Sequence, residues 1–405
     1  TCFLAAAAAP IFDPSLRQLP LGGDEAYEFP VRRAFYSIER RSIALSGARA
    51  NAEIEIGSLY ANSRLPGETD SKASQPLLFA RAEAWLRHAK ALRPTDAQAM
   101  EVAAIVGACV ADGLEPRQHP PGTVFDLQAQ LWAELGYARR LTGDLAGGGA
   151  ALGRAVRSAG RGSGDLQILT KIAEIVSSHR VAGREFEDSK RILEWVLAAY
   201  VQNSDLQQAG KALVLLGLTS GYAGNAEEAV SYFSSALRWI DGAKDPRLAF
   251  AAIHNLLWFS AEIGRFSFVA RLIGECRKLY REVAQPLDRL KFHWMCARCA
   301  AAEGDSGAAE FRFREVRRSF EERGMPYLTA LVSLDLGVVL LERGRSREAL
   351  ELVEETTAAF VALGIERESL AALVLLAQAL GQERASAALF RRAAAEVKRL
   401  EATLA

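Results

Sequence analysis

Hydrophobic positions along most of this chain recur with the spacing of amphipathic helices. In residues 215–237, LLGLTSGYAGNAEEAVSYFSSAL, apolar residues follow i, i+3, i+4 and i+7 spacing on both sides of Gly224. The same arrangement surrounds a series of glycines that follow one another every 40 or 41 residues, at positions 143, 183, 224, 264, 304 and 344. This pattern predicts pairs of helices, each pair joined by a tight turn at its glycine.

Small residues stand at fixed distances from these glycines. Seven residues before them the chain has Gly136, Gly217, Ala297 and Gly337, and five residues after them it has Ala229, Ala309 and Ala349. We expect these residues to let paired helices approach closely. Larger residues should fill the space between neighbouring pairs, namely Phe233, Ile273, Phe313 and Val353. Since a lone hairpin cannot bury both of its faces, the pairs should stack into one continuous core.

The arrangement of Leu216, Gly217, Gly224, Ala229, Phe233 and Ala236 resembles the signature of the tetratricopeptide repeat. That family's repeat has about 34 residues, whereas this chain repeats every 40, which predicts helices about one turn longer. The chain therefore looks like the long-repeat bacterial variety of the family. The resemblance implies an all-α fold, a right-handed α-solenoid of stacked antiparallel helix hairpins.

Three regions are expected along the chain. Residues 1–30 contain four prolines and should form an extended segment or linker. Residues 31–123 should form an irregular helical region, with a hairpin at 77–92 and 97–111. Residues 124–405 should form the solenoid, closed by a capping hairpin at 368–380 and 386–404 whose charged residues suit a solvent-facing surface.

The resemblance also implies a binding surface. In the family, the first helix of every hairpin lines a concave groove that holds the ligand. Carried over to this chain, that face comprises Tyr137, Arg140, Arg180, Lys211, Tyr222, His254, Asn255, Trp258, Lys291, Trp294, Arg298 and Asp335. Aromatic anchors mixed with cations suit an extended peptide or an acidic helix. The alternative, that Trp258 and Trp294 pack between neighbouring hairpins, stays open.

Composition and charge narrow the function classes. The 405 residues include 49 Lys plus Arg and 49 Asp plus Glu, so no excess positive charge favours nucleic acid or an anionic membrane. No apolar run is long enough to span a membrane. Five cysteines are too few and too scattered for a disulfide framework. We therefore expect a cytoplasmic protein.

Motifs for chemistry are scarce. HWMCARC, residues 293–299, brings His293, Cys296 and Cys299 together, but no second cysteine pair completes a zinc site, so core packing is the prediction. A metal-dependent enzyme at these residues is an alternative. Another is that Cys2 is the last ligand of a zinc finger preceding residue 1. The glycine-rich stretches at 147–149 and 160–164 lack the lysine of a phosphate-binding loop. Neither a cofactor nor a metal is predicted.

The function expected from the sequence is a non-enzymatic scaffold that binds a peptide or partner protein in the concave groove, in a bacterial regulatory role. The alternative is a peptide- or ligand-sensing module that controls an effector domain before residue 1. Neither the partner nor the oligomeric state follows from the sequence.

Overall fold

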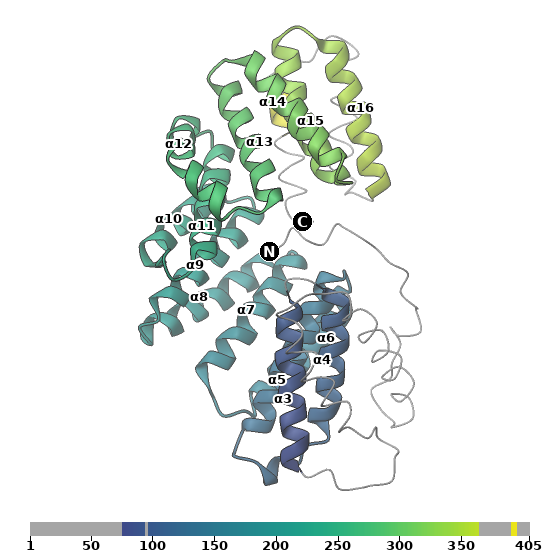
Figure 1. The fold of residues 1–405 in the computed structure, drawn as a ribbon, viewed down its shortest axis with the longest axis vertical. Coiled ribbons are helices and arrows are strands. Elements are labelled where there is room, and N and C mark those ends of the chain that lie inside the picture. Colours follow the sequence, from purple (N-terminus) through teal and green to yellow (C-terminus); the bar gives the residue numbers. More distant parts are fainter. Residues whose placement is uncertain (1–74, 94–95, 364–389, 395–405) are drawn as a thin grey trace. The chain divides into compact units, whose positions relative to one another are not determined.

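The computed structural model describes residues 75–93, 96–363 and 390–394, and every regular element in these ranges is helical (Figure 1). The chain divides into two compact units at the bond between His179 and Arg180. We call residues 75–179 the N-terminal unit and residues 180–363 with 390–394 the C-terminal unit. No helix in the described ranges is long and apolar enough to cross a membrane. The all-α class predicted from the sequence is confirmed.

The N-terminal unit is built from helix hairpins around a single core. Its elements are α3 (Gln75–Leu92), α4 (Ala97–Asp112), the 3₁₀ helix η2 (Pro116–Gln118), α5 (Thr123–Leu141), α6 (Leu145–Ala159) and most of α7 (Leu166–Ala182). The first pair is the hairpin predicted at 77–111. Trp85, Leu131 and Ile172 belong to one buried cluster, so α3 and α4 share their core with α5 and α7. The expected division at residue 123 stays a prediction.

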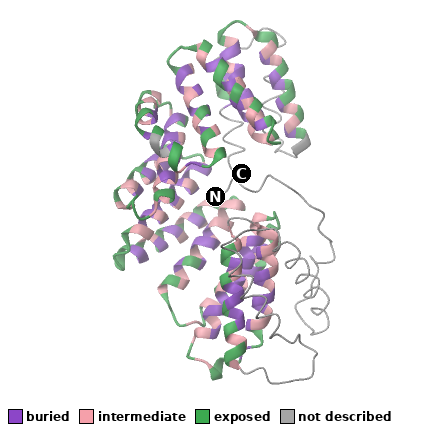
Figure 2. Cartoon of the chain, viewed as in Figure 1, coloured by how far each residue is buried: buried purple, intermediate pink, exposed green. Residues whose placement is uncertain are grey.

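The C-terminal unit is a stack of helix pairs. Its elements are α8 (Phe186–Gln202), α9 (Leu206–Tyr222), α10 (Ala226–Trp239), α11 (Pro246–Glu262), α12 (Phe266–Glu282), α13 (Pro286–Ala302), α14 (Ser306–Glu321), α15 (Pro326–Glu342) and α16 (Ser346–Leu363). Each helix packs on the next, and α11 also contacts α9 and α13. Figure 2 shows the buried residues on the sides where these helices face one another. This is the stacking of hairpins that the repeat predicts.

The turns follow the predicted glycine spacing, with one correction. Five of the six glycines adopt the left-handed conformation, with φ between 74° and 90°: Gly143, Gly224, Gly264, Gly304 and Gly344. The prediction at Gly183 is wrong, since the left-handed residue there is Arg184, with φ of 63°. In all six turns the left-handed residue lies two positions before the first residue of the next helix. Because α8 begins at Phe186, that residue is Arg184. The start of the second helix therefore fixes the position of the turn.

Small residues occur where helices approach most closely. A Cβ added to Gly217 would lie 2.8 Å from the ring of Phe233, and one added to Gly136 would lie 2.6 Å from Leu152. Both contacts join the two helices of one hairpin, as predicted. At Gly337 the corresponding distance is 2.4 Å, but the neighbour is Phe390, outside the α15–α16 hairpin. The alanines and large residues predicted for the core are buried as well: Ala229, Ala309, Ala349, Phe233, Ile273, Phe313 and Val353.

Some predictions fall on residues that the structure does not describe. They concern the extended segment, the part of the irregular helical region that precedes residue 75, Cys2, and all but five residues of the predicted capping hairpin. Residues 390–394 are helical, with Phe390 and Ala394 buried. Arg391 and Arg392 are exposed, and Arg391 pairs with Glu342 of α15. This short segment has the buried side and the charged side expected of a cap.

Candidate partner-binding face

The twelve residues predicted to bind a partner all lie on the first helices of successive pairs. They are Tyr137 and Arg140 on α5, Arg180 on α7, Lys211 and Tyr222 on α9, His254, Asn255 and Trp258 on α11, Lys291, Trp294 and Arg298 on α13, and Asp335 on α15. Tyr137 and Arg140 belong to the N-terminal unit and the other ten to the C-terminal unit. The two groups are therefore described separately.

Four of the predicted residues form one cluster across three consecutive first helices. The rings of Trp258 and Trp294 meet edge to face, with centroids 5.1 Å apart. The indole Nε1 of Trp294 donates a hydrogen bond to Asp335 Oδ2 at 2.7 Å. The guanidinium of Arg298 lies 5.8 Å from the ring centroid of Trp258, within reach of a cation–π interaction. The sequence prediction thus brought together residues that are 77 positions apart, from Trp258 to Asp335.

A fifth residue of this cluster was missed in the sequence. Arg298 Nη1 donates to Glu262 Oε1 at 2.7 Å, so the cation is paired with a carboxylate of the neighbouring first helix. Glu262 follows Trp258 by four residues on α11 and therefore lies on the same helix face. That spacing could have identified it. We call Trp258, Glu262, Trp294, Arg298 and Asp335 the Trp258 cluster.

Burial differs widely within the Trp258 cluster. Trp294 is only 1% exposed, whereas Trp258 and Asp335 are half-buried. The side chain of Arg298 is 12% exposed and that of Glu262 is 27% exposed. Burial acts to lower the pKa of Arg298, but the carboxylates of Glu262 and Asp335 outweigh it, and the pKa is raised above its usual value. Arg298 is therefore a charged group, and Trp258, Glu262 and Asp335 form the accessible part of the cluster.

His254 and Lys291 lie deeper than the sequence prediction assumed. His254 is 8% exposed, and its Nδ1 lies 2.8 Å from the hydroxyl of Tyr280. Its ring stacks on Phe250, with centroids 5.7 Å apart. Burial, with a contribution from the charge of Lys291, lowers the pKa of His254 to about 4, so the ring is neutral at pH 7. Lys291 is 7% exposed. These contacts make His254 a core residue in this structure.

The remaining members of the C-terminal group are dispersed. Tyr222 is 9% exposed, and Lys211 is half-buried. Asn255 donates from Nδ2 to the carbonyl of Ala251, one turn earlier in its own helix, at 2.8 Å. Arg180 pairs with Glu185 across the α7–α8 turn. Of the twelve predicted residues, Tyr222, His254, Lys291 and Trp294 are thus buried rather than accessible on the helix face. Their binding role stays a prediction.

In the N-terminal unit, Tyr137 lies between two arginines. The guanidiniums of Arg93 and Arg140 are 4.8 Å and 4.9 Å from its ring centroid. Arg93 also donates two hydrogen bonds, of 2.6 Å and 2.7 Å, to the carboxylate of Glu134, which is 2% exposed. Arg140 forms no ion pair within the described part of the chain, and its buried Nε has no hydrogen-bond acceptor there. We call Arg93, Glu134, Tyr137 and Arg140 the Tyr137 cluster.

The cysteines that suggested a metal site lie in the hydrophobic core. Cys276 and Cys299 are buried in one cluster with Met295 and Tyr280, and Cys296 packs against it. Burial raises the pKa of the Cys299 thiol to about 11, which keeps it protonated. His293 is exposed. Within the described residues, no three His, Cys, Asp or Glu side chains are placed to hold a metal ion. The prediction of core packing for these cysteines is confirmed.

Comparison with known proteins supports the fold. No protein-family model matches the sequence, and no match is found among the curated proteins. A Rap protein crystallised with competence and sporulation factor superimposes with a TM-score of 0.55 and 11% identity, covering 79% of this chain and 98% of its own. The apo form of RapI gives a TM-score of 0.52 at 12% identity, covering 70% and 98%.

At identities this low, the likeness establishes the fold alone. Together with the repeated hairpins, it defines the chain as a helical-repeat protein with a tetratricopeptide-like α-solenoid, as the sequence predicted.

Proposed function

We propose that the first-helix face of the C-terminal unit binds a peptide or a partner protein, and that the protein acts as a non-enzymatic scaffold. The observation that carries this proposal is the Trp258 cluster. It combines a half-buried aromatic ring, a charged arginine and two carboxylates on three consecutive first helices. Tryptophan and arginine contribute most to the energy of protein interfaces.

The contacts around Trp258 also explain how the site would be held in place. Trp294 is held by its hydrogen bond to Asp335, and its ring makes an edge-to-face contact with the ring of Trp258. Arg298 is fixed by Glu262. A ligand would meet side chains whose rotamers are already restricted, which reduces the entropy lost on binding. The similar Rap structure contains competence and sporulation factor, so a solenoid of this fold can hold a ligand.

The test is peptide selection against the purified protein, followed by affinity measurement with two matched double variants. Trp258→Leu with Arg298→Met alters the cluster and retains apolar volume. Trp195→Leu with Arg191→Met makes the same two substitutions on the exposed side of α8, a second helix, where Trp195 is 48% exposed. We expect the first variant to weaken binding of selected peptides by about 100-fold and the second to leave it unchanged. Equal affinities for both variants, with unchanged melting temperatures, would contradict the proposal.

A sensing role is the second candidate, and the turns at both ends of α8 favour it. Arg184 and Ser204 are the described non-glycine residues with positive φ, 63° and 57°. Such residues cost about 1 kcal/mol each, and strained backbone is found at switch regions. If a ligand acts through this segment, hydrogen exchange in α8 should change on peptide binding, and Arg184→Gly should reduce that change. Identical exchange with and without peptide would exclude the segment.

A further inference from the structure

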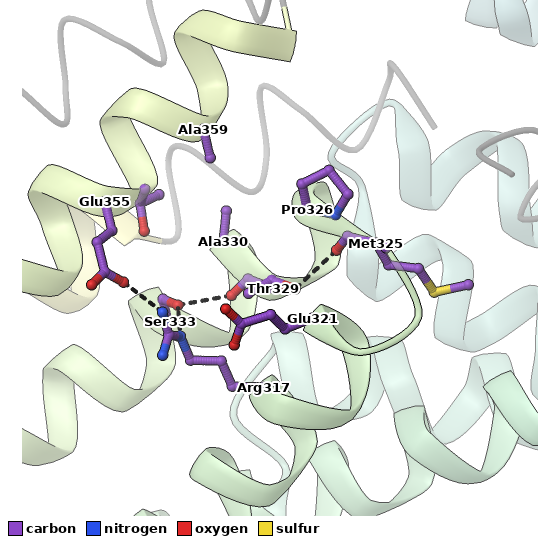
Figure 3. Close-up of a pocket in the computed structure, with 11 residues that line it drawn as sticks. Arg317, Glu321, Met325, Pro326, Thr329, Ala330, Ser333, Glu355 and Ala359 are labelled. Atoms are coloured by element: carbon purple, nitrogen blue, oxygen red, sulfur yellow. Dashed lines mark hydrogen bonds and ion pairs between the residues drawn. The ribbon is translucent and has the colours of Figure 1, made fainter. Parts of the chain in front are cut away.

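A cavity of about 220 Å³ lies between α14, α15 and α16 of the C-terminal unit (Figure 3). None of its lining residues belongs to the Trp258 cluster, so it is a separate site from the proposed binding face. Its polar side chains are Arg317 and Glu321 of α14, Thr329 and Ser333 of α15, and Glu355 and Thr356 of α16.

The hydroxyl hydrogens of Thr329 and Ser333 and two of the donor nitrogens of Arg317 are already in use. Arg317 donates from Nη2 to Glu355 Oε2 at 2.5 Å and from Nε to Ser333 Oγ at 3.0 Å. Ser333 Oγ donates to the carbonyl of Thr329 at 2.8 Å, and Thr329 Oγ1 donates to the carbonyl of Met325 at 3.0 Å. The dashed lines in Figure 3 follow this chain of bonds. The hydroxyl oxygens of Thr329 and Ser333 can therefore still accept a hydrogen bond from a ligand.

Further acceptors in the cavity have no partner. Thr356 is 1% exposed, and its Oγ1 has no hydrogen-bond partner within the described residues. An unsatisfied buried hydroxyl costs about 1–3 kcal/mol, which a donor from a ligand would recover. The Glu321 carboxylate likewise forms no ion pair with any described residue. With Glu321 and Glu355 facing the single cation Arg317, the lining carries one net negative charge.

The rest of the lining is apolar and suits an aliphatic chain. Met325, Pro326, Ala330 and Ala359 supply these surfaces. A cavity of about 150 Å³ holds benzene, so this one has room for about six to nine heavy atoms. An ammonium has three donors and no acceptor, and a guanidinium has five donors and no acceptor. The lining therefore matches a cation at the end of a short hydrocarbon stem.

We propose that this cavity binds an alkylammonium or alkylguanidinium group, supplied either by a lysine or arginine side chain of a partner or by a free amine. Glu321 and Glu355 would balance the charge, Thr356 would accept a hydrogen bond, and Met325 and Ala359 would enclose the stem. The proposal does not depend on the Trp258 cluster, because the two sites share no residue.

The chain offers a clean spectroscopic probe. It contains three methionines, of which Met325 lines the cavity, while Met100 and Met295 are fully buried elsewhere. With methyl-¹³C-methionine, addition of N-acetyl-lysine methylamide or of 1-aminopentane should shift the Met325 signal saturably and leave the other two in place. The Nε-acetylated lysine derivative, which is neutral, should bind at least about fivefold more weakly.

Variants complete the test. Glu321→Gln should weaken binding of both amines by about fivefold. Glu322→Gln, the neighbouring exposed residue that does not line the cavity, should leave it unchanged. Thr356→Val, which preserves the volume of the side chain, should also weaken binding of both amines.

Tighter binding of the lysine derivative assigns the site to a partner's side chain, and tighter binding of 1-aminopentane assigns it to a free amine. The proposal is overturned if Met325 does not respond, if the neutral derivative binds equally, or if the two Glu→Gln variants behave alike.

Discussion

The Tyr137 cluster and the Trp258 cluster use the same kinds of side chain in opposite ways. In the Tyr137 cluster two guanidiniums contact a half-buried ring, and the cluster contains two arginines and one glutamate, which pairs with Arg93. In the Trp258 cluster one indole is 1% exposed, and one arginine faces two carboxylates. The net charges of the two clusters are therefore opposite in sign.

The two clusters also differ in burial and in how far their charges are paired within the described residues. In the Trp258 cluster, the indole hydrogen bond to Asp335 lets a polar aromatic residue lie in the core. In the Tyr137 cluster, Arg140 contacts the ring of Tyr137 and has no ion pair among the described residues. The following predictions, from the largest expected effect to the smallest, test whether the clusters differ as described.

Truncation of the buried indole should have the largest effect. Trp294→Ala should lower the free energy of unfolding by about 3–5 kcal/mol, because it removes a fully buried aromatic residue together with the indole hydrogen bond to Asp335. Tyr137→Ala should cost about 1–2 kcal/mol, because that ring is half-buried. Denaturant unfolding measures both. Equal costs would contradict the difference in burial between the Trp294 and Tyr137 rings.

Acid should destabilise the C-terminal unit through His254. Its pKa is lowered from 6.5 to about 4, so between these pH values the unfolded chain binds a proton that the folded protein does not. Stability should therefore fall as pH falls through this range, by up to about 3 kcal/mol at pH 4. His254→Gln should flatten the dependence of urea midpoints on pH between 7 and 4.5. His293→Gln, at an exposed histidine of the same helical stack, is the matched control. A wild-type slope in the His254 variant would contradict this assignment.

The two arginine–glutamate pairs should differ in their contribution to stability. Glu134 is 2% exposed and accepts two hydrogen bonds from Arg93, so Glu134→Gln should cost about 1–3 kcal/mol. Glu262 is 27% exposed and accepts one from Arg298, so Glu262→Gln should cost about 1 kcal/mol or less. Both are measured by equilibrium unfolding. A larger loss for Glu262→Gln would reverse the ranking.

The smallest effect is expected at Arg140. Arg140→Met should change the free energy of unfolding by less than about 0.5 kcal/mol, because no ion pair within the described residues is lost. Arg298→Met should cost about 1–2 kcal/mol, because Glu262 would lose its partner. Thermal unfolding of the two variants provides the comparison. If Arg140→Met is the more destabilising, Arg140 has a structural role that its contacts do not show.

Much of the fold could be predicted because its signals are local. Glycines spaced by 40 residues marked five turns correctly, because each of these turns has a left-handed residue just before its second helix, and glycine adopts that conformation without strain. At the sixth turn the left-handed residue is Arg184 and not Gly183, because α8 begins at Phe186. The spacing of the glycines does not predict where that helix begins.

The candidate sites were predictable only in part. Helical spacing placed Trp258 and Arg298 on corresponding faces, but the partners of Arg93 and Arg298 depend on contacts between helices far apart in sequence. The cavity between α14, α15 and α16 has no sequence motif at all. Its donors and acceptors come from three helices, and the shortage of donors appears only when each hydrogen bond is traced.

By itself, the sequence of this protein determined that it forms helix pairs which must stack, because small residues and apolar faces recur with the period of a hairpin. The tertiary structure decided which polar residues remain available to a ligand. Lys211 and Lys291 lie two repeat periods apart and so occupy equivalent positions, yet Lys291 is 7% exposed and Lys211 is half-buried. The reason is that burial depends on the side chains that adjacent helices bring against a residue, and those neighbours are set by packing between repeats rather than by the pattern within one.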